Sequence, residues 1–430
     1  MTPQSAFMVV APIRQGHIGA LRDLLRGMTQ APGTADPDNA LIPFGRFERL
    51  HFARLAVLDD ATLADRVVGG APAVPLPVAL AFLGDCDGPA EAQLAAFAAL
   101  AGPGLRAIFA HCEDYSDDRD LLAWMQARSV APATCYVNWV GRTVRQVHQE
   151  AALHQALRAR LALQAQDAPP QTVRAALLEY VAAEQRHGRL PLSPPEPTPP
   201  SWQFRQLLDA IGVPLLLLLL LPVFLLGAVP FLFALRQRER TDPEIFPRPT
   251  VAHEAALAAI EDHDVSNQFS AFGSRKPGAF RLWLLRFLLW VVQYTTRHVY
   301  VRGRLARVGT IHFARWVLLD GNHRLFFGSN YDGSLDSYMD DFINKVAWGL
   351  NLVFSNGIGY PRTRFLALDG AKNEQAFKYY IRRHQLPTEV WFKAYPGLTA
   401  LDLARNSRIR AGLQPAAMSD DAARRWIALI

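Results

Sequence analysis

Apolar runs of seven to nine residues recur along the chain, and clusters of Gly, Pro, Asn and Asp separate them. Such bounded runs predict β-strands, and stretches with apolar residues every three or four positions predict helices. Each half of the chain shows the order strand, helix, strand, strand, helix, strand. The eight predicted strands are residues 7–13, 50–58, 78–84, 134–140, 267–273, 311–319, 324–330 and 389–395.

The two sets of predicted strands also share sequence. The second strand and its turn read HFARLAVLDD from His51 and HFARWVLLDG from His312. An arginine precedes each histidine by 37 residues, at Arg14 and at Arg275. The run ALAFLGDCDG matches RLFFGSNYDG, which follows it by 245 positions, and PATCYVNWVG resembles PTEVWFKAYPG. Several blocks in the same order and at nearly the same spacing indicate an internal duplication.

The order βαββαβ is that of the ferredoxin-like unit. We therefore predict an α+β fold, in which two ferredoxin-like βαββαβ repeats form a pseudo-dimeric α/β barrel and a hydrophobic membrane segment is inserted between them. The predicted parts are a first repeat, a helix with a Pro-rich linker, the membrane segment, a second linker, the second repeat and a C-terminal tail. Their bounds are 1–165, 166–205, 206–240, 241–265, 266–415 and 416–430.

The membrane segment is a stretch of 26 residues without charge, from Ala210 to Leu235. As a helix it would be ~39 Å long at the usual rise per residue, more than the ~30 Å hydrocarbon core of a bilayer. Pro222 lies at its midpoint, and proline kinks a helix. The segment therefore predicts either a kinked span or a re-entrant hairpin of two half-helices. Arginines flank it on both sides, at Arg205 and from Arg236 onward.

The duplication favours the hairpin, or a segment lying at the membrane interface. Two repeats that pack together must lie on the same side of the bilayer, whereas a single span would separate them. The flanking arginines predict that this side is the cytoplasmic face. The run Phe280–Val292 has two tryptophans and two arginines, which suits a helix at the interface, a core helix of the second repeat or, least well, a second span.

Composition narrows the function classes. The 430 residues include 50% hydrophobic ones, which excludes a disordered chain. Three unevenly spaced cysteines exclude a disulfide framework and a zinc site built from cysteine. We predict no metal site, because the one polar cluster, His111 to Asp114, lacks ligand spacing. The 45 basic residues against 39 acidic ones are scattered among apolar helices, so no nucleic-acid partner is predicted.

The repeated HFAR sequence places a histidine and an arginine on opposite faces of one strand, so the two residues cannot serve one site. Arg315 shares its face with apolar neighbours and needs an anionic partner. That partner is either a bound carboxylate or a buried ion-pair member, for example Asp320 or Asp332. Because the second copy is richer in polar and aromatic side chains, we place the ligand there. The candidate ligand-binding residues are Arg315, His312, Asn330, Tyr331, Asp332, Asn356, Lys393, Tyr395 and Arg275.

In the second copy, the runs IHFARWVLLDG, FGSNYDGSLDSYMDDFI and PTEVWFKAYPGL carry a resemblance. Together with the βαββαβ order, they make the chain similar to the dimeric α/β-barrel superfamily, which includes dye-decolourising peroxidases and chlorite dismutases. The second copy also resembles a set of uncharacterised bacterial membrane-associated proteins. The resemblance implies a cavity between sheet and helices and makes haem a candidate cofactor. GDCDG at Gly84 resembles the sequence around the peroxidases' distal aspartate, but no histidine stands out as a proximal ligand.

Three functions fit these observations. The first is a membrane-attached two-repeat protein that binds a hydrophobic or anionic small molecule, either lipid or haem. The second is a haem-dependent oxidoreductase of the peroxidase or monooxygenase type on the same fold. The third is a scaffold that holds a partner enzyme at the lipid bilayer. The sequence contains no P-loop, no GxSxG and no HExxH motif, and it identifies no catalytic residue.

Overall fold

The computed structural model describes residues 1–72, 74, 76–164, 168–301, 303, 305, 307–415 and 417–430. Helices and antiparallel sheets alternate along this chain, so the fold is mixed α+β, as predicted. All eight predicted strands are present, and two of them, β4 (Leu50–Leu58) and β8 (Ile311–Leu319), have the predicted bounds. The same physical signal, a bounded apolar run, therefore identified every long strand.

The long strands form two separate four-stranded antiparallel sheets. The first sheet has the order β1-β5-β4-β12, and the second has the order β6-β8-β9-β7. The remaining bounds are β1 Gln4–Pro12, β5 Ala79–Asp87, β6 Thr134–Val137, β7 Ser266–Ser274, β9 Arg324–Asp332 and β12 Thr388–Lys393. No closed barrel is seen in the described part of the chain, so the predicted barrel is not confirmed.

Each sheet takes its edge strand from the other half of the chain. Strand β12, from the C-terminal half, pairs with β4 through residues such as Trp391 and Arg54. In the same way, β6 of the N-terminal half pairs with β8 of the C-terminal half. The two halves are therefore joined by backbone hydrogen bonds as well as by side chains, and they lie on the same side of any membrane.

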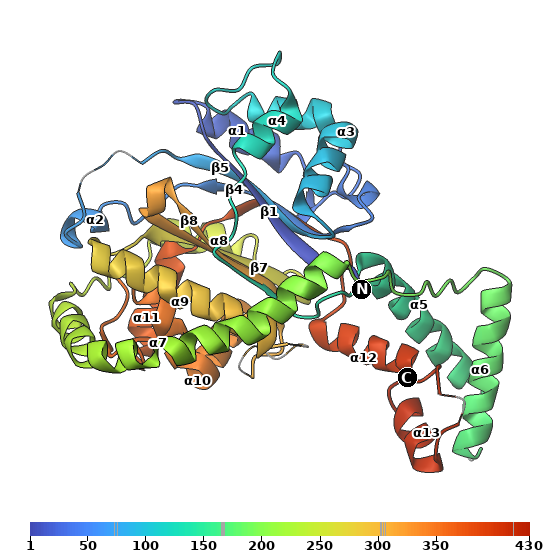
Figure 1. The fold of residues 1–430 in the computed structure, drawn as a ribbon. Helices are drawn as coiled ribbons and strands as arrows, with labels where there is room; N and C mark the ends of the chain where they lie inside the picture. The colour runs from blue at the N-terminus through green and yellow to red at the C-terminus, as the bar shows by residue number, and fades with distance from the viewer. Residues whose placement is uncertain are drawn as a thin grey trace.

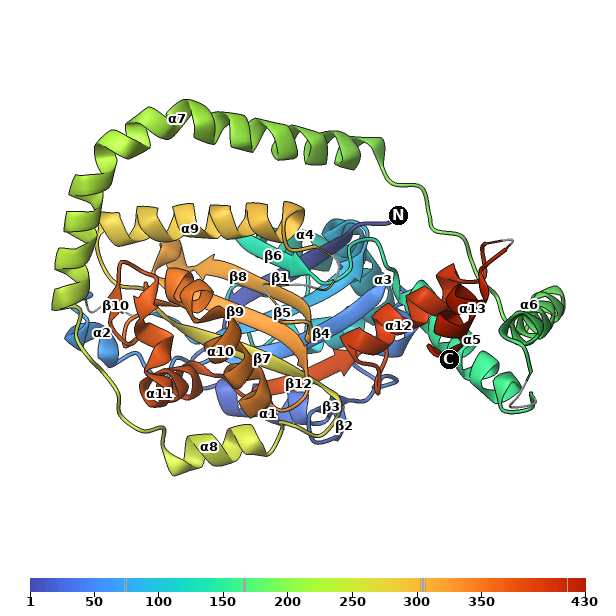
Figure 2. The same cartoon turned by 90° about the horizontal axis from the view of Figure 1, so that it is seen from below.

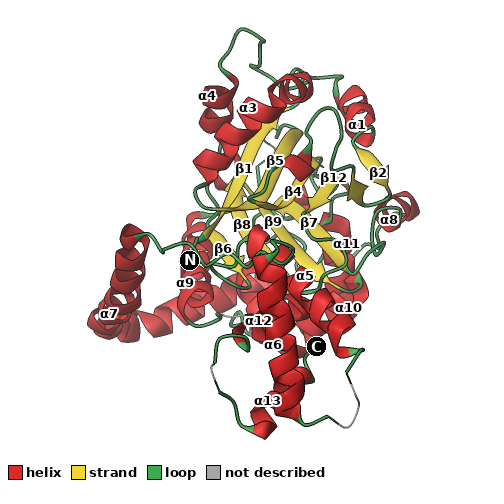
Figure 3. Cartoon of the chain, turned by 90° about the vertical axis from the view of Figure 1, so that its right-hand side faces the viewer, coloured by secondary structure: helices red, strands yellow, loops and turns green. Residues whose placement is uncertain are grey.

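The two sheets pack face to face, and helices cover their outer faces (Figure 3). Apolar side chains from both sheets fill the interface between them, among them Met8, Leu83, Phe272, Val317 and Phe326. The helices over the first sheet are α1 Ile18–Arg26, α3 Ala90–Phe109 and α4 Leu121–Ala127. Those over the second sheet are α9 Ala279–His298, α10 Leu335–Phe354 and α11 Glu374–His384. The result is a four-layer arrangement.

Helices α3 and α10 share an unusual feature. Each has 20 residues and one residue with non-helical angles at the same place, Ala101 (φ −120°, ψ 17°) and Val346 (φ −143°, ψ 24°). These two residues are 245 positions apart, which is also the spacing between the matching third strands. The two halves therefore agree in local backbone geometry where their sequences differ.

Four further helices form a group beside the sheets (Figure 1). They are α5 Val144–Leu161, α6 Pro170–Arg186, α12 Ala400–Ala411 and α13 Asp420–Ile427. The shorter elements are α2 Asp65–Val68, α8 Val251–Ala258, β2 Thr29–Ala31, β3 Thr34–Ala35, β10 Thr363–Arg364, β11 Leu368–Asp369 and the 3₁₀ turns Phe44–Arg46, Asp320–Asn322 and Gly370–Lys372.

The charge-free segment lies within one helix, α7 (Pro200–Thr241), of 42 residues. The predicted hairpin is wrong for this structure: the helix bends but does not fold back, and it passes outside α9 (Figure 2). Prolines inside a helix cost hydrogen bonds and bend it without ending it when the flanking turns are apolar. Of the described helices, α3 and α7 are long and apolar enough to cross a membrane. Half of the most apolar stretch of α3 is buried within the protein, whereas none of that of α7 is.

Candidate apolar binding site

The predicted ligand-binding arginine lies between the two sheets, far from any open space. Arg315 donates to the carbonyl of Phe7 at 2.9 Å and forms an ion pair with the carboxylate of Asp85 on the opposite sheet. Its partner is thus neither Asp320 nor Asp332. Burial raises the pKa of Asp85, and Arg315 opposes that shift. The geometry gives Arg315 a structural ion pair between the halves.

Arg54, the matching arginine of the first half, makes the reciprocal contacts. It donates to the carbonyl of Phe269 at 2.8 Å, to Ser270 Oγ at 2.9 Å and to the side-chain oxygen of Asn330. Asn330 and Asp85 are 245 positions apart and occupy matching places on β9 and β5. Burial, with Arg315 as the second cause, lowers the pKa of Arg54 to about 9. The two buried arginines therefore lie close enough to repel each other, and it is Arg315 that forms the ion pair with Asp85.

The histidines of HFAR make matching pairs as well. His312 Nε2 lies 2.6 Å from Asp332 Oδ1, and His51 Nε2 lies 2.9 Å from Asp87 Oδ1. The second oxygen of each aspartate accepts from the first amide of a following helix, Ala400 at 2.7 Å in α12 and Val144 at 2.9 Å in α5. A carboxylate at a helix N-terminus is stabilised by the free amides and the helix dipole. These pairs connect sheet to helix.

The other predicted site residues are engaged in local contacts. Tyr331 stacks on Tyr338, with ring centroids 4.0 Å apart. The remaining contacts join Asn356 to the carbonyl of Leu352, Lys393 to Asp264, Tyr395 to His51, and Arg275 to the carbonyls of Asn322 and Lys276. None of the nine predicted residues lines the apolar cavity described next. The structure thus divides them among several structural contacts.

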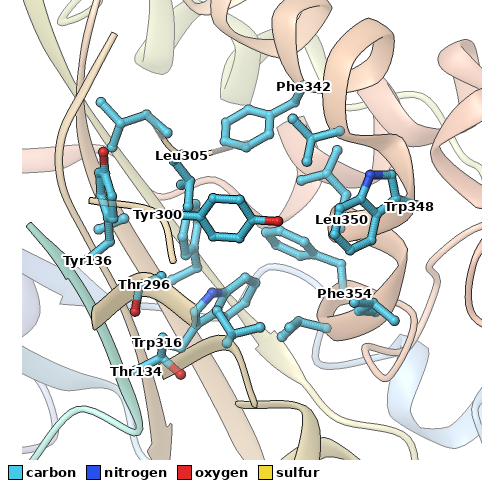
Figure 4. Close-up of a pocket in the computed structure, with 18 of the residues that line it drawn as sticks. Thr134, Tyr136, Thr296, Tyr300, Leu305, Trp316, Phe342, Trp348, Leu350 and Phe354 are labelled. Carbon is cyan, nitrogen blue, oxygen red and sulfur yellow. The ribbon is translucent and has the colours of Figure 1, made fainter. Parts of the chain in front are cut away.

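The most apolar cavity lies between the second sheet and helices α9 and α10, and has a volume of about 170 Å³. Its walls carry no charged side chain among the described residues. Figure 4 shows Tyr300 reaching toward Trp348 and Leu350, with Trp316 and Phe354 on the wall below. Trp348 is 48% exposed, so the cavity reaches the surface beside it. Further lining residues are Tyr136, Phe269, Val292, Ala314, Phe327, Tyr338, Met339, Phe342, Val346 and Val353.

The polar atoms of the lining are few and uncharged. Burial raises the pKa of Tyr136 and of Tyr338 above the ordinary value, so both phenols stay neutral. Tyr338 exchanges a hydrogen bond with Ser329 at 2.8 Å, and Thr134 donates to the carbonyl of Leu289 at 2.8 Å. The buried hydroxyl of Tyr136 has no hydrogen-bond partner. A cavity whose walls are this apolar binds apolar groups rather than water. The arrangement can enclose hydrocarbon but offers no acid, base or nucleophile.

The first half has the same aromatic residues without the cavity. Phe7, Phe82 and Phe97 match Phe269, Phe327 and Phe342 by position. In the first half the three rings close on one another at 4.9–5.4 Å. In the second half Phe342 packs on Tyr338 at 4.8 Å, and all three phenylalanines line the cavity.

The residues lining the cavity do not suit haem. No histidine or cysteine occurs among its described lining residues, and the best sequence candidate, His312, points to Asp332 instead. The described residues also include no group of three or more His, Cys, Asp or Glu that could hold a metal ion. We therefore derive no chemical step through haem.

The resemblance led us to expect a cavity between sheet and helices, but sequence reasoning missed the residues that line this one, because they are of the kinds that also form ordinary cores. The available signal was a size difference between the copies. Phe47 of the first half lies 4.5 Å from Phe97 and is replaced by Val308 at the matching position. The chain matches no protein-family model, no curated protein and no solved structure.

Proposed function

We propose that this chain is a membrane-attached protein that encloses the end of a hydrocarbon chain in the cavity of its second half. The observation that carries the proposal is the uncharged cavity of about 170 Å³ beside α9. Burial of apolar surface is the main driving force available there, since the lining offers no ion and few free hydrogen-bonding atoms. The ligand class is therefore a lipid, and not an anionic small molecule.

The volume limits how much of a lipid can enter. A cavity of roughly 150 Å³ lined by apolar side chains accommodates a molecule the size of benzene. The present cavity is thus large enough for the last few carbons of an acyl or isoprenoid chain, and too small for a whole lipid. Each buried methylene contributes about 0.8 kcal/mol. A handful of them gives binding that is reversible, as an exchange with the bilayer requires.

A second part of the proposal concerns the origin of the fold. We propose that two ferredoxin-like repeats, similar to those of the dimeric α/β-barrel superfamily, arose by duplication and exchanged their fourth strands. The equal strand order of the two sheets and the matching kinks at Ala101 and Val346 support this origin. Arginines at both ends of the apolar helix support attachment at the cytoplasmic face. The haem-dependent alternative gains no support, because His312 is paired with Asp332.

Photocrosslinking tests the proposal. A fatty acid with a diazirine on its last carbons is incorporated into vesicles that hold the protein, and crosslinked peptides are mapped by mass spectrometry. We expect crosslinks on lining residues such as Trp316 and Phe354. A fatty acid with the diazirine near its carboxylate should instead label the outside of α7 and α9.

Filling variants provide the control. Ala314→Phe on β8 and Val292→Phe on α9 place new volume in the cavity from two different elements. Both should abolish crosslinks to Trp316 while leaving those on exposed Trp283 unchanged. If the terminal diazirine labels only exposed positions in the unaltered protein, the cavity is not a chain-binding site and the proposal fails.

A further inference from the structure

The first part of α7 runs alongside α9 in the opposite direction, and the helix then bends past the N-terminal end of α9 (Figure 2). Phe224 meets Phe287 with ring centroids 6.4 Å apart, and Phe231 meets Phe280 at 5.6 Å. Further along, Asp209 of α7 lies 3.8 Å from Arg297 near the end of α9. The contacts thus extend over most of the length of both helices. The long apolar helix runs along the surface of the body and does not project from it.

The two helices expose a continuous apolar surface. On α9 the exposed large side chains Trp283, Phe287 and Trp290 follow helical spacing along one face. On α7 nearly the whole circumference is exposed where it is not against α9. Its exposed large apolar residues are Phe204, Leu207, Leu208, Ile211, Leu215, Leu216, Leu218, Leu219, Leu221, Val223, Phe224, Leu225, Leu226, Val229, Phe231, Leu232 and Phe233. A helix that is apolar all round needs an apolar surrounding.

Both ends of α7 are fixed to the same body. At the C-terminal end, buried Glu239 accepts from the amides of Phe365 and Leu366, each at 2.9 Å. Just before the N-terminal end of α7, the carboxylate of Glu196 accepts a hydrogen bond from the hydroxyl of Thr2, which lies just before β1. A helix that crossed the bilayer would end on its far side. The anchored ends therefore exclude crossing in this arrangement.

The dimensions suit one leaflet. A helix with its side chains is about 10–12 Å thick, and one leaflet supplies about half of the ~30 Å hydrocarbon core. Helix α7 can thus sink into one leaflet to its full thickness, with the outer face of α9 beside it, while the sheets stay outside. The carbonyl of Ala210, freed by Pro214 four residues on, accepts from the hydroxyl of Tyr294 at 3.5 Å. That contact gives the Ala210 carbonyl a hydrogen-bond donor, which the hydrocarbon of the bilayer cannot supply.

The charges of the two helices favour an anionic surface. They contain seven arginines and no lysine, against two acidic residues. Of the two acids, Glu239 is fully buried and Asp209 faces Arg297. Arg205, Arg240 and Arg286 are exposed at the ends and along the side of the apolar surface. Cations beside an apolar helix interact with anionic headgroups while the helix lies beneath them.

We propose that the first part of α7, up to its bend, and the outer face of α9 insert side by side into a single leaflet of a bilayer rich in anionic lipid, parallel to its plane and without crossing it. Val291, Val292 and Thr295 of α9 line the cavity, so the helix that meets the membrane is also a cavity wall. The cavity then takes its hydrocarbon chain directly from that leaflet. This last step rests on the proposed function; the in-plane arrangement does not.

Depth measurements test the arrangement. A small fluorophore is attached to cysteines introduced singly for exposed Leu208, Leu215 and Leu221, and the full-length protein is reconstituted in phosphatidylglycerol vesicles. Lipids with quenchers at shallow and deep chain positions then report the depth of each label. We expect all three labels at the same shallow depth. A depth that passes through the bilayer centre at Leu215, with Leu208 and Leu221 nearer opposite surfaces, would overturn the proposal.

Vesicle binding tests the charge requirement. Flotation should show at least 10-fold tighter binding to phosphatidylglycerol than to phosphatidylcholine vesicles. Arg286→Gln should weaken binding to the anionic vesicles about 5-fold, from the contribution of one arginine near a charged surface. Arg106→Gln, on α3 of the first half, should not change it. Equal binding to both lipids would overturn the anionic leaflet. These outcomes do not depend on whether the cavity is occupied.

Discussion

The two halves of the molecule use the same aromatic residues in different ways. In the first half, Phe7, Phe82 and Phe97 close into one cluster under α3. In the second half Phe269 still meets Phe327 at 5.9 Å, but Phe342 packs on Tyr338 instead, and all three rings line an apolar cavity. The difference therefore does not originate in the phenylalanines themselves. It originates in what packs behind them.

Two changes near the first helix account for the opening. Helix α1 has 9 residues, and α9 starts at the matching position but has 20. The connection to the next strand shortens by the same amount, from residues 27–49 to residues 299–310. In the first half that connection carries Phe47 onto Phe97 and lays the backbone of Leu41 against Gly104. In the second half, a longer helix, α9, replaces this connecting segment. Helix α9 exposes apolar side chains on its outer face and leaves the cavity open on its inner face.

The largest expected difference between the halves concerns the two interface arginines. Arg315→Met removes the cation that forms an ion pair with buried Asp85 and should cost about 3–5 kcal/mol of unfolding free energy. Arg54→Met leaves the Arg315–Asp85 pair intact and relieves repulsion between two buried cations. Arg54→Met should therefore lower the unfolding free energy by less, about 1–3 kcal/mol, because the oxygens that accept from Arg54 lose their donor. Chemical denaturation of both variants in the same detergent measures the difference.

The double variant sharpens this comparison. Asp85→Asn makes the first half identical to the second at the matching position, Asn330. In that background, Arg315→Met should lose most of its extra cost, because no buried carboxylate remains unpaired. Equal costs for the two arginines in the unaltered chain would mean that the Asp85 charge is neutralised by some other group.

A second comparison concerns the room for a larger side chain at Ala53 of β4 and at Ala314, the matching residue of β8. Ala53 is buried in the closed first-half core, and Ala314 lines the cavity. Ala53→Leu should destabilise by about 2 kcal/mol, since extra volume in a filled core forces strain. Ala314→Leu should change stability by less than about 0.5 kcal/mol, the range of well-tolerated substitutions. Thermal unfolding would contradict the cavity if both variants lost stability equally.

The smallest expected effect is a pH dependence that arises from Lys276 in the second half. Burial lowers the pKa of Lys276 to about 8, although Asp242 at 2.6 Å opposes the shift. The residue of the first half that matches Lys276 in backbone pairing is Arg14: its amide donates to the carbonyl of His111, as that of Lys276 donates to Asn356. Above pH 8 the folded protein loses this proton while the unfolded chain keeps it up to its ordinary value of 10.5. Stability should therefore rise with pH in this window.

Lys276→Gln isolates that effect. The unfolding free energy of the unaltered protein, measured relative to this variant, should rise by about 1 kcal/mol between pH 8 and pH 9. The variant itself lacks the titrating group and corrects for all others. A difference that stays flat across this range would show that Asp242 keeps the lysine charged.

Local sequence was a good guide to the elements and a poor guide to their partners. Strands β4 and β8 appeared at the predicted residues because an apolar run bounded by turn formers carries its own signal. The exchange of β6 and β12 could not be predicted, since a strand's sequence does not specify which edge it joins. The same limit applies to Arg315. Its need for a buried anion followed from its apolar neighbours, but Asp85 is 230 residues away in the chain.

The candidate site shows a second limit. Polar residues on and beside the strands, such as Asn330 and Lys393, were predicted to bind a ligand because the second copy has more of them than the first. In the structure they hydrogen-bond to the protein itself. The cavity depends on small differences in side-chain volume and connection length, as at Phe47 and Val308, and an apolar residue next to a void has the same sequence pattern as one in a filled core.

The exchange of edge strands also affects the order in which the protein is completed during synthesis. Strand β4 is made early, but its neighbour β12 begins only at Thr388, 330 residues after β4 ends at Leu58. Until then, one edge of the first sheet stays open on the ribosome, with unpaired backbone groups that can join other chains. Strand β6 waits in the same way for β8. In between, the apolar α7 emerges, so early capture of that helix by a membrane would hold the waiting halves together until the last strand arrives.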